Sequence, residues 1–202
     1  MPPKGERRKL QIIDTAKEMF IKEGFQSTHI GQVCEKLNIA RGTVYQYFSN
    51  KKEILYAILD GVIEEIEDIL DPDDLTEFLG SNTDREKIKK FIHRRIAGTL
   101  SVLVNEPIVI KLIFKDIVGI DADVAERVNV SIMNLARIIS SEISELKSKK
   151  IYKQTVDPQI TASMLIGGVM MIVYEYEKKN KDVQNNLLID SITDNYLNGV
   201  VE

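Results

Sequence analysis

Helical spacing of apolar residues along nearly the whole chain is the feature that most limits the fold. Between residues 6 and 23, for example, Ile13, Ala16 and Phe20 lie three and four positions apart, which places them on one face of a helix. No window shows the sustained alternation of apolar and polar residues that a half-buried strand requires. The sequence therefore predicts an all-α protein of about nine helices.

Start and stop signals set the expected bounds of these helices. Gly24 and Asn38 are suited to the positive φ of a tight turn, Thr28 is expected to cap the second helix, and Asp157-Pro158 is a strong start signal. The polar segment 73–83 is expected to be an irregular linker. The predicted helices are 6–23, 30–37, 41–48, 51–70, 84–104, 107–118, 122–149, 158–178 and 186–197.

Composition excludes several classes of protein. Hydrophobic residues make up 44% of the 202 residues, which is too many for an extended disordered chain. The lone Cys34 cannot form a disulfide within the chain. The apolar stretch 162–174 lies within the longest uncharged run, 158–174, which is short of the roughly 20 residues that cross a bilayer. Because no amino-terminal signal segment is seen either, we expect a cytoplasmic protein.

Residues that would carry metal or catalytic chemistry are scarce. The two His residues and Cys34 do not form a cluster with zinc spacing. Asp71, Asp73 and Asp74 suggest a calcium loop, but Thr76 stands where the sharp turn of such a loop needs Gly. No nucleophile is paired with a base. We therefore expect no metal, no cofactor and no enzymatic activity.

Charge is distributed unevenly along the chain. Residues 1–55 contain 10 Lys and Arg against 6 Asp and Glu, whereas residues 56–202 contain 17 against 25. A basic amino-terminal segment suggests a polyanionic partner for that segment, although a chance bias of four charges would give the same balance.

Two short predicted helices with a turn of about four residues between them, preceded by a longer helix, describe a helix-turn-helix. The sequence of this region resembles the amino-terminal domain of TetR-family transcriptional regulators over about residues 8–57. The resemblance is carried by Thr28, Ile30, the turn 38–40, the run Gly42-Thr43-Val44-Tyr45-Gln46-Tyr47-Phe48, and Lys51. Asn38 replaces the usual turn Gly, and Ala40 replaces the usual Ser or Thr cap of the recognition helix.

The polar residues of the third helix suit DNA. Arg41 can donate two hydrogen bonds to guanine and Gln46 can pair with adenine, although either residue could instead contact phosphate alone. The resemblance places backbone contacts at Thr28, Thr43, Tyr45, Tyr47 and Lys51. The alternative for Tyr45 and Tyr47 is that they pack the third helix against its neighbours, and for Tyr45 the two interpretations are equal. The predicted DNA-binding set is Thr28, Arg41, Gly42, Thr43, Tyr45, Gln46, Tyr47 and Lys51, with Lys4, Arg7, Arg8 and Lys9 as possible further phosphate contacts.

The resemblance also implies two functional domains and a dimer. Residues 1–50 would form the DNA-binding domain and residues 51–202 a helical ligand-binding and dimerisation domain. One short recognition helix covers few base pairs, so specific binding needs two half-sites and a two-fold homodimer. The expected interface residues are Ile160, Met164, Gly168, Met171, Leu188, Ile192 and Tyr196, and the alternative is that these residues close the core of each monomer.

The family further implies a chamber for a small effector inside the carboxy-terminal helices. Candidate lining residues are Phe91, Ile92, Ile96, Leu103, Ile113, Phe114, Met133, Met170 and Tyr174. The expected function is a sequence-specific regulator, a repressor released from a palindromic operator by an apolar or amphipathic effector. The alternatives are an activator or a regulator controlled by a protein partner, and a helical small-molecule-binding protein that does not bind DNA.

Overall fold

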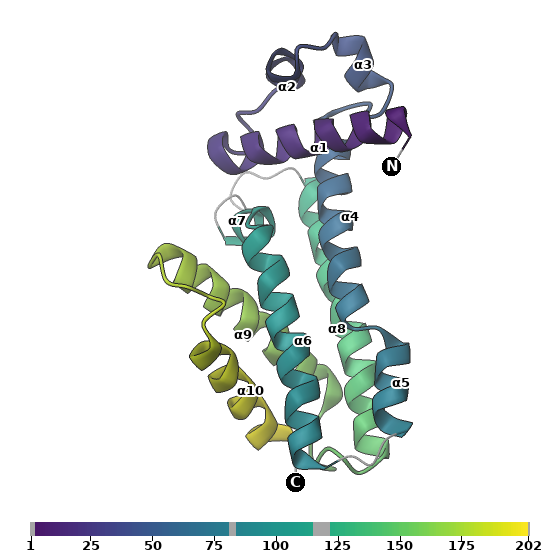
Figure 1. The fold of residues 1–202 in the computed structure, drawn as a ribbon, viewed down its shortest axis with the longest axis vertical. Coiled ribbons are helices and arrows are strands. Elements are labelled where there is room, and N and C mark those ends of the chain that lie inside the picture. The colour runs from purple at the N-terminus through teal and green to yellow at the C-terminus, as the bar shows by residue number, and fades with distance from the viewer. Residues whose placement is uncertain (1–2, 81–83, 115–121, 202) are drawn as a thin grey trace. The chain divides into compact units, whose positions relative to one another are not determined.

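The computed structural model describes residues 3–80, 84–114 and 122–201, and within these ranges the chain forms ten helices and no β-strand (Figure 1). The all-α prediction is confirmed. The helices are α1 (Lys4–Glu23), α2 (Ile30–Leu37), α3 (Arg41–Tyr45), α4 (Lys51–Ile69), α5 (Pro72–Gly80), α6 (Arg85–Asn105), α7 (Ile108–Phe114), α8 (Ala122–Ser148), α9 (Pro158–Lys178) and α10 (Asn186–Val200).

The chain divides into two compact units. The first contains residues 1–63 together with 107–128, and the second contains residues 64–106 together with 129–202. Both α4 and α8 run continuously from one unit into the other. The expected boundary between the two functional domains, after residue 50, does not coincide with this division, because the first unit also contains the beginning of α4 and all of α7. That functional boundary stays a prediction.

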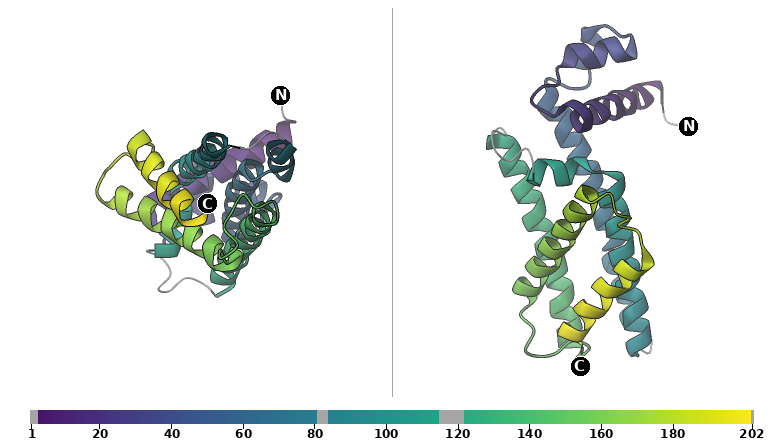
Figure 2. Two further views of the ribbon diagram at one scale, coloured as in Figure 1. Left: turned by 90° about the horizontal axis from the view of Figure 1, so that it is seen from below. Right: turned by 90° about the vertical axis from the view of Figure 1, so that its left-hand side faces the viewer.

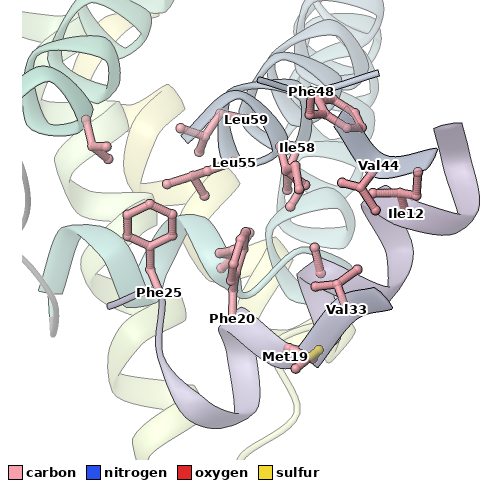
Figure 3. Packing of buried hydrophobic residues seen from close by; sticks show 14 of the residues in the cluster. Ile12, Met19, Phe20, Phe25, Val33, Val44, Phe48, Leu55, Ile58 and Leu59 are labelled. Carbon is pink, nitrogen blue, oxygen red and sulfur yellow. The ribbon is translucent and has the colours of Figure 1, made fainter. Parts of the chain in front are cut away.

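The core of the first unit is built from apolar side chains of α1 to α4, of α7 and of the beginning of α8. Ile12, Val44 and Leu55 are fully buried in it, and Figure 3 shows Val44 of α3 beside Ile12 of α1. Phe20 and Phe25 pack edge to face with their ring centres 5.2 Å apart. A five-residue helix such as α3 is not stable alone, so the burial of Val44 and the following Phe48 fixes its position.

Helix α5 was not predicted, and the expectation of an irregular linker is wrong for residues 73–80; residues 81–83 lie outside the described ranges. Asp71 accepts a hydrogen bond from the N–H of Asp73 at 2.9 Å, and Pro72 occupies the first helical position. This is the same Asp-Pro start signal that begins α9. The acidic residues that suggested a solvated linker instead favour the first turn of a helix, and the burial of Leu75 holds the helix in place.

Turns between helices follow the predictions in part. Asn38 has φ 51° and ψ 50°, the expected left-handed conformation. Gly24 has the expected positive φ of 89°, but its ψ of 150° is not that of a Schellman ending. Thr28 does not cap α2, because its hydroxyl donates to the carbonyl of Gly24 at 2.9 Å and His29 is the N-cap. Helix α10 continues through Gly199, beyond its expected end.

In the second unit, α6 lies beside both α9 and α10 (Figure 2). Arg95 of α6 is only 5% exposed. One of its terminal nitrogens contacts the carboxylate of Glu142 on α8, and the other lies 3.3 Å from Asp74 on α5. The guanidinium also stands over the ring of Phe91 at 4.2 Å. Burial raises the pKa of Glu142, and the neighbouring guanidinium only partly opposes that effect.

Among the described residues, no single helix combines the length and the hydrophobicity needed to cross a membrane, although α6 and α7 would meet that criterion if counted as one span.

Candidate nucleic-acid interface

Helix α3 and the turn after it separate their side chains cleanly between the core and the solvent. Val44 and Phe48, four positions apart, are buried. Arg41, Tyr45 and Gln46 are exposed, and the exposed fraction of Tyr45 is 53%. One face of this short segment therefore anchors it, while the other presents a long cation, a phenol and an amide.

Arg41 rests on the first turn of α2. A Cβ atom added to Gly31 would lie 2.8 Å from a terminal nitrogen of Arg41 and 3.5 Å from its central guanidinium carbon. Any side chain larger than that of glycine at residue 31 would therefore displace the guanidinium. Gly31 is not among the predicted site residues, and the signal in the sequence that could have identified it is a glycine within a short helix, where glycine is unfavourable.

The amino end of α3 lacks a side-chain cap. Ala40 occupies the N-cap position without a side-chain hydrogen bond, as its departure from the family pattern implies. Gly42 is exposed, and a Cβ atom added to it would meet no atom within 4 Å, so packing does not require the absence of a side chain there.

A basic groove runs between α1 and α3. Its volume is about 350 Å³, and its lining comprises Lys4, Gly5, Arg7, Arg8, Gln11, Thr43 and Tyr47. Thr43 and Tyr47 are half-buried. Three of the four basic residues expected to attract phosphate thus lie along one groove with two of the residues predicted to contact the DNA backbone.

Thr28 and Lys51 are placed differently from the other predicted DNA contacts. Thr28 is 1% exposed and its hydroxyl is used within the turn. The ammonium of Lys51 is turned towards backbone carbonyl groups of residues 25, 26 and 28, and burial lowers its pKa. The remaining members of the set present a side chain or backbone at the surface.

The predicted effector-lining residues differ in burial and do not all lie in the same unit. Phe91, Ile92, Ile96 and Leu103 are buried in the second unit, where Met170 and Tyr174 are half-buried, whereas Ile113 and Phe114 are half-buried in the first unit. Met133 is 71% exposed and does not line the interior of its unit. Met133 was the only candidate on α8, and the sequence alone does not show which face of that helix is turned inward.

The predicted dimer residues of α9 form an exposed apolar stripe. The exposed fractions are 62% for Ile160, 72% for Met164 and 44% for Met171. Gly168 lies on the same side, and a Cβ built there meets no atom within 4 Å. These residues do not close the core of the monomer, which was the alternative. On α10, Leu188, Ile192 and Tyr196 are half-buried.

Residues 12–58 match the family model described as "Bacterial regulatory proteins, tetR family". The regulator HbdR of Aromatoleum sp. (strain CIB) is 35% identical over 66 residues, which cover 33% of this chain and 29% of HbdR. This chain thus aligns with less than a third of that relative's length. The uncharacterised regulator YhgD of Bacillus subtilis is 24% identical over 87% of this chain and 86% of its own.

Solved structures share the fold over almost the whole length. The fatty acid degradation regulator FadR of Bacillus halodurans has a TM-score of 0.75 and 18% identity, and the match covers 95% of both chains. FadR of Bacillus subtilis, solved in complex with stearoyl-CoA, has a TM-score of 0.71 and 19% identity over 94% of this chain and 98% of that one.

Among the described residues, the short helix α3, anchored by two buried residues and preceded by α2 and a tight turn, has the form of a DNA-binding helix-turn-helix. The match to the TetR-family model over residues 12–58, together with the similarity to YhgD over most of the chain, makes this segment similar to the helix-turn-helix segment of TetR-family regulators.

Proposed function

We propose that this protein is a cytoplasmic repressor that binds a palindromic operator as a homodimer and leaves it when a small apolar or amphipathic effector binds. The observation that carries the proposal is the division of α3 and its following turn: Val44 and Phe48 are buried, while Arg41, Tyr45 and Gln46 face outward. That arrangement suits a segment that is held rigidly on one side and contacts the major groove with the other.

We assign base contacts to Arg41 and Gln46. The fork of an arginine matches guanine O6 and N7, and a glutamine amide matches adenine N6 and N7. Thr43, Tyr45, Tyr47 and the backbone at Gly42 would hold the phosphates. The basic groove on α1 would add sequence-independent attraction that weakens steeply as salt rises.

The exposed stripe on α9 supports the proposed homodimer. Large apolar side chains as exposed as Ile160 and Met164 are a feature of interaction surfaces. A two-fold interface there, completed by Leu188, Ile192 and Tyr196 on α10, would present two recognition helices to two half-sites.

The nature of the effector is proposed from the structural relative that was solved with stearoyl-CoA. A long-chain acyl thioester is amphipathic and would suit the apolar residues Phe91, Ile96, Leu103, Met170 and Tyr174. Helix α4 begins at Lys51 in the first unit and continues to Ile69 in the second unit. A shift of this helix would therefore transmit effector binding to the DNA-binding elements.

Fluorescence anisotropy with a duplex selected by the protein from a random-sequence library tests the proposal. Arg41→Ala should relax the preference for one base pair, whereas Lys36→Ala, a surface substitution on α2, should leave that preference intact. Adding stearoyl-CoA should release the DNA, and by linkage DNA must weaken stearoyl-CoA binding by the same factor. Equal stearoyl-CoA affinity with and without DNA would refute the effector assignment, and absence of any DNA binding would refute the function.

A further inference from the structure

The side chain of Lys51, the first residue of α4, turns back towards the segment between α1 and α2. Its Nζ lies 2.8 Å from the carbonyl oxygen of Phe25, 2.9 Å from that of Gln26 and 3.1 Å from that of Thr28. The same nitrogen stands 4.7 Å from the centre of the Phe25 ring. One side chain therefore joins the start of α4 to a turn that lies more than 20 residues earlier in the chain.

A lysine ammonium has three N–H donors and no acceptor. Three carbonyl oxygens within hydrogen-bond distance account for all three donors. A phosphate oxygen that approached Lys51 would have to displace one of these carbonyls, which would then lose a charge-assisted hydrogen bond. The geometry thus disfavours the role of phosphate ligand for this side chain.

The turn that Lys51 holds determines where α2 lies. Phe25 is buried against Phe20, and the buried Thr28 closes the turn through its bond to Gly24. Helix α2 begins at Ile30, only two residues later. A shift of this turn would move α2, and with it Gly31, on which the guanidinium of Arg41 rests.

We propose that Lys51 is a positioning residue: its ammonium group fixes the α1–α2 turn on the amino end of α4 and thereby aligns α2 and the recognition helix, without contacting phosphate. This assignment rests on the proposed DNA-binding function. It also gives α4 a direct connection to α2 in addition to the chain that joins α3 to α4.

The test compares Lys51→Met and Lys51→Arg with Lys36→Met in the full-length protein. Lys36 is a matched control, because its ammonium lies on the surface of α2 and pairs with Glu18 at 2.6 Å. Affinity for a duplex selected by the wild-type protein is measured at several KCl concentrations. Amide hydrogen exchange of residues 29–33 is measured without DNA.

Lys51→Met should weaken binding about tenfold at every salt concentration, because hydrogen bonds from a charged group are lost. The slope of log affinity against log salt should be unchanged, and exchange at residues 29–33 should be faster. Lys51→Arg should share both defects, since a planar guanidinium cannot direct donors from one nitrogen to three carbonyls. Lys36→Met should change neither affinity nor exchange.

A slope shallower by about 0.9, the value for one lost phosphate contact, with unchanged exchange and full affinity of Lys51→Arg, would overturn the proposal. If Lys51→Met does not fold, Lys51→Arg decides: faster exchange supports positioning, and wild-type exchange with wild-type affinity rejects it. Failure of the wild-type protein to bind any duplex would refute the proposed function, while the exchange measurement would still decide the role of Lys51.

Discussion

Replacing Gly31 by Ala should raise stability and impair DNA recognition together. The new Cβ would lie 2.8 Å from the terminal nitrogen of Arg41, which is closer than carbon and nitrogen atoms pack. The obstructing group is the end of a long, exposed side chain, so the folded state can relax by moving it. Alanine is also the better helix former, so the free energy of unfolding should rise by up to about 1 kcal/mol.

The loss in DNA binding follows from the displaced guanidinium. In the wild-type protein, contact with α2 restricts Arg41 before DNA arrives. Ordering one long side chain on binding costs about 0.5–1.5 kcal/mol, which corresponds to roughly 2- to 13-fold weaker binding, since 1.4 kcal/mol is a factor of ten. The loss should be largest for operators that retain the base pair contacted by Arg41.

Urea denaturation and competition binding with single-base operator variants measure the two effects. Gly61→Ala in α4 is the control, because a Cβ built at Gly61 meets no atom within 4 Å and should add stability without changing base preference. The reasoning is refuted if Gly31→Ala binds every operator variant as the wild type does while Arg41→Ala does not. A marked loss of stability would refute it equally.

Three other predictions concern the second unit. Arg95→Ala should lower the free energy of unfolding by about 3–5 kcal/mol in urea denaturation, because it leaves the buried carboxylate of Glu142 without its partner; a change below about 1 kcal/mol would mean that the pair is solvated. Burial raises the pKa of Glu142, so the folded state keeps a proton that the unfolded state loses, and stability should fall as pH rises from the ordinary glutamate pKa of about 4.3 through the raised value. Glu142→Gln should remove that part of the pH dependence, measured by urea midpoints at mildly acidic pH, and an unaltered profile would contradict the assignment. Met164→Asp should shift the proposed dimer towards monomer in sedimentation velocity, whereas Met133→Asp, at an equally exposed methionine of α8, should leave it dimeric; equal effects would place the interface elsewhere.

Local patterns predicted the elements of the DNA-binding segment well. The spacing of Val44 and Phe48 is sufficient to assign them to the core. The tight turn at Asn38 is predicted from the tolerance of asparagine for positive φ alone. Helix α5 differs from the expectation because the acidic residues after Pro72 also fit a solvated linker. Their position just after an Asp-Pro pair was the stronger signal, as it was at the start of α9.

The features that the sequence did not predict depend on distant partners. Arg95 lies on a helix rich in charge, and its burial is explained only by Glu142, 47 positions later. Lys51 matched a family position for phosphate contact, but its three carbonyl partners lie in a turn whose fold depends on the packing of Phe25. The exposed position of Met133 likewise depends on how α8 is rotated in its unit, and periodicity does not determine that rotation.

The burial of Cys34 within α2 has a practical consequence. Its side chain is 5% exposed, and the chain contains no other cysteine. A buried thiol reacts with alkylating reagents only when the surrounding structure opens. The rate at which Cys34 is alkylated in the native protein therefore reports the opening of α2, and a thiol placed on the surface can be labelled selectively while Cys34 stays protected.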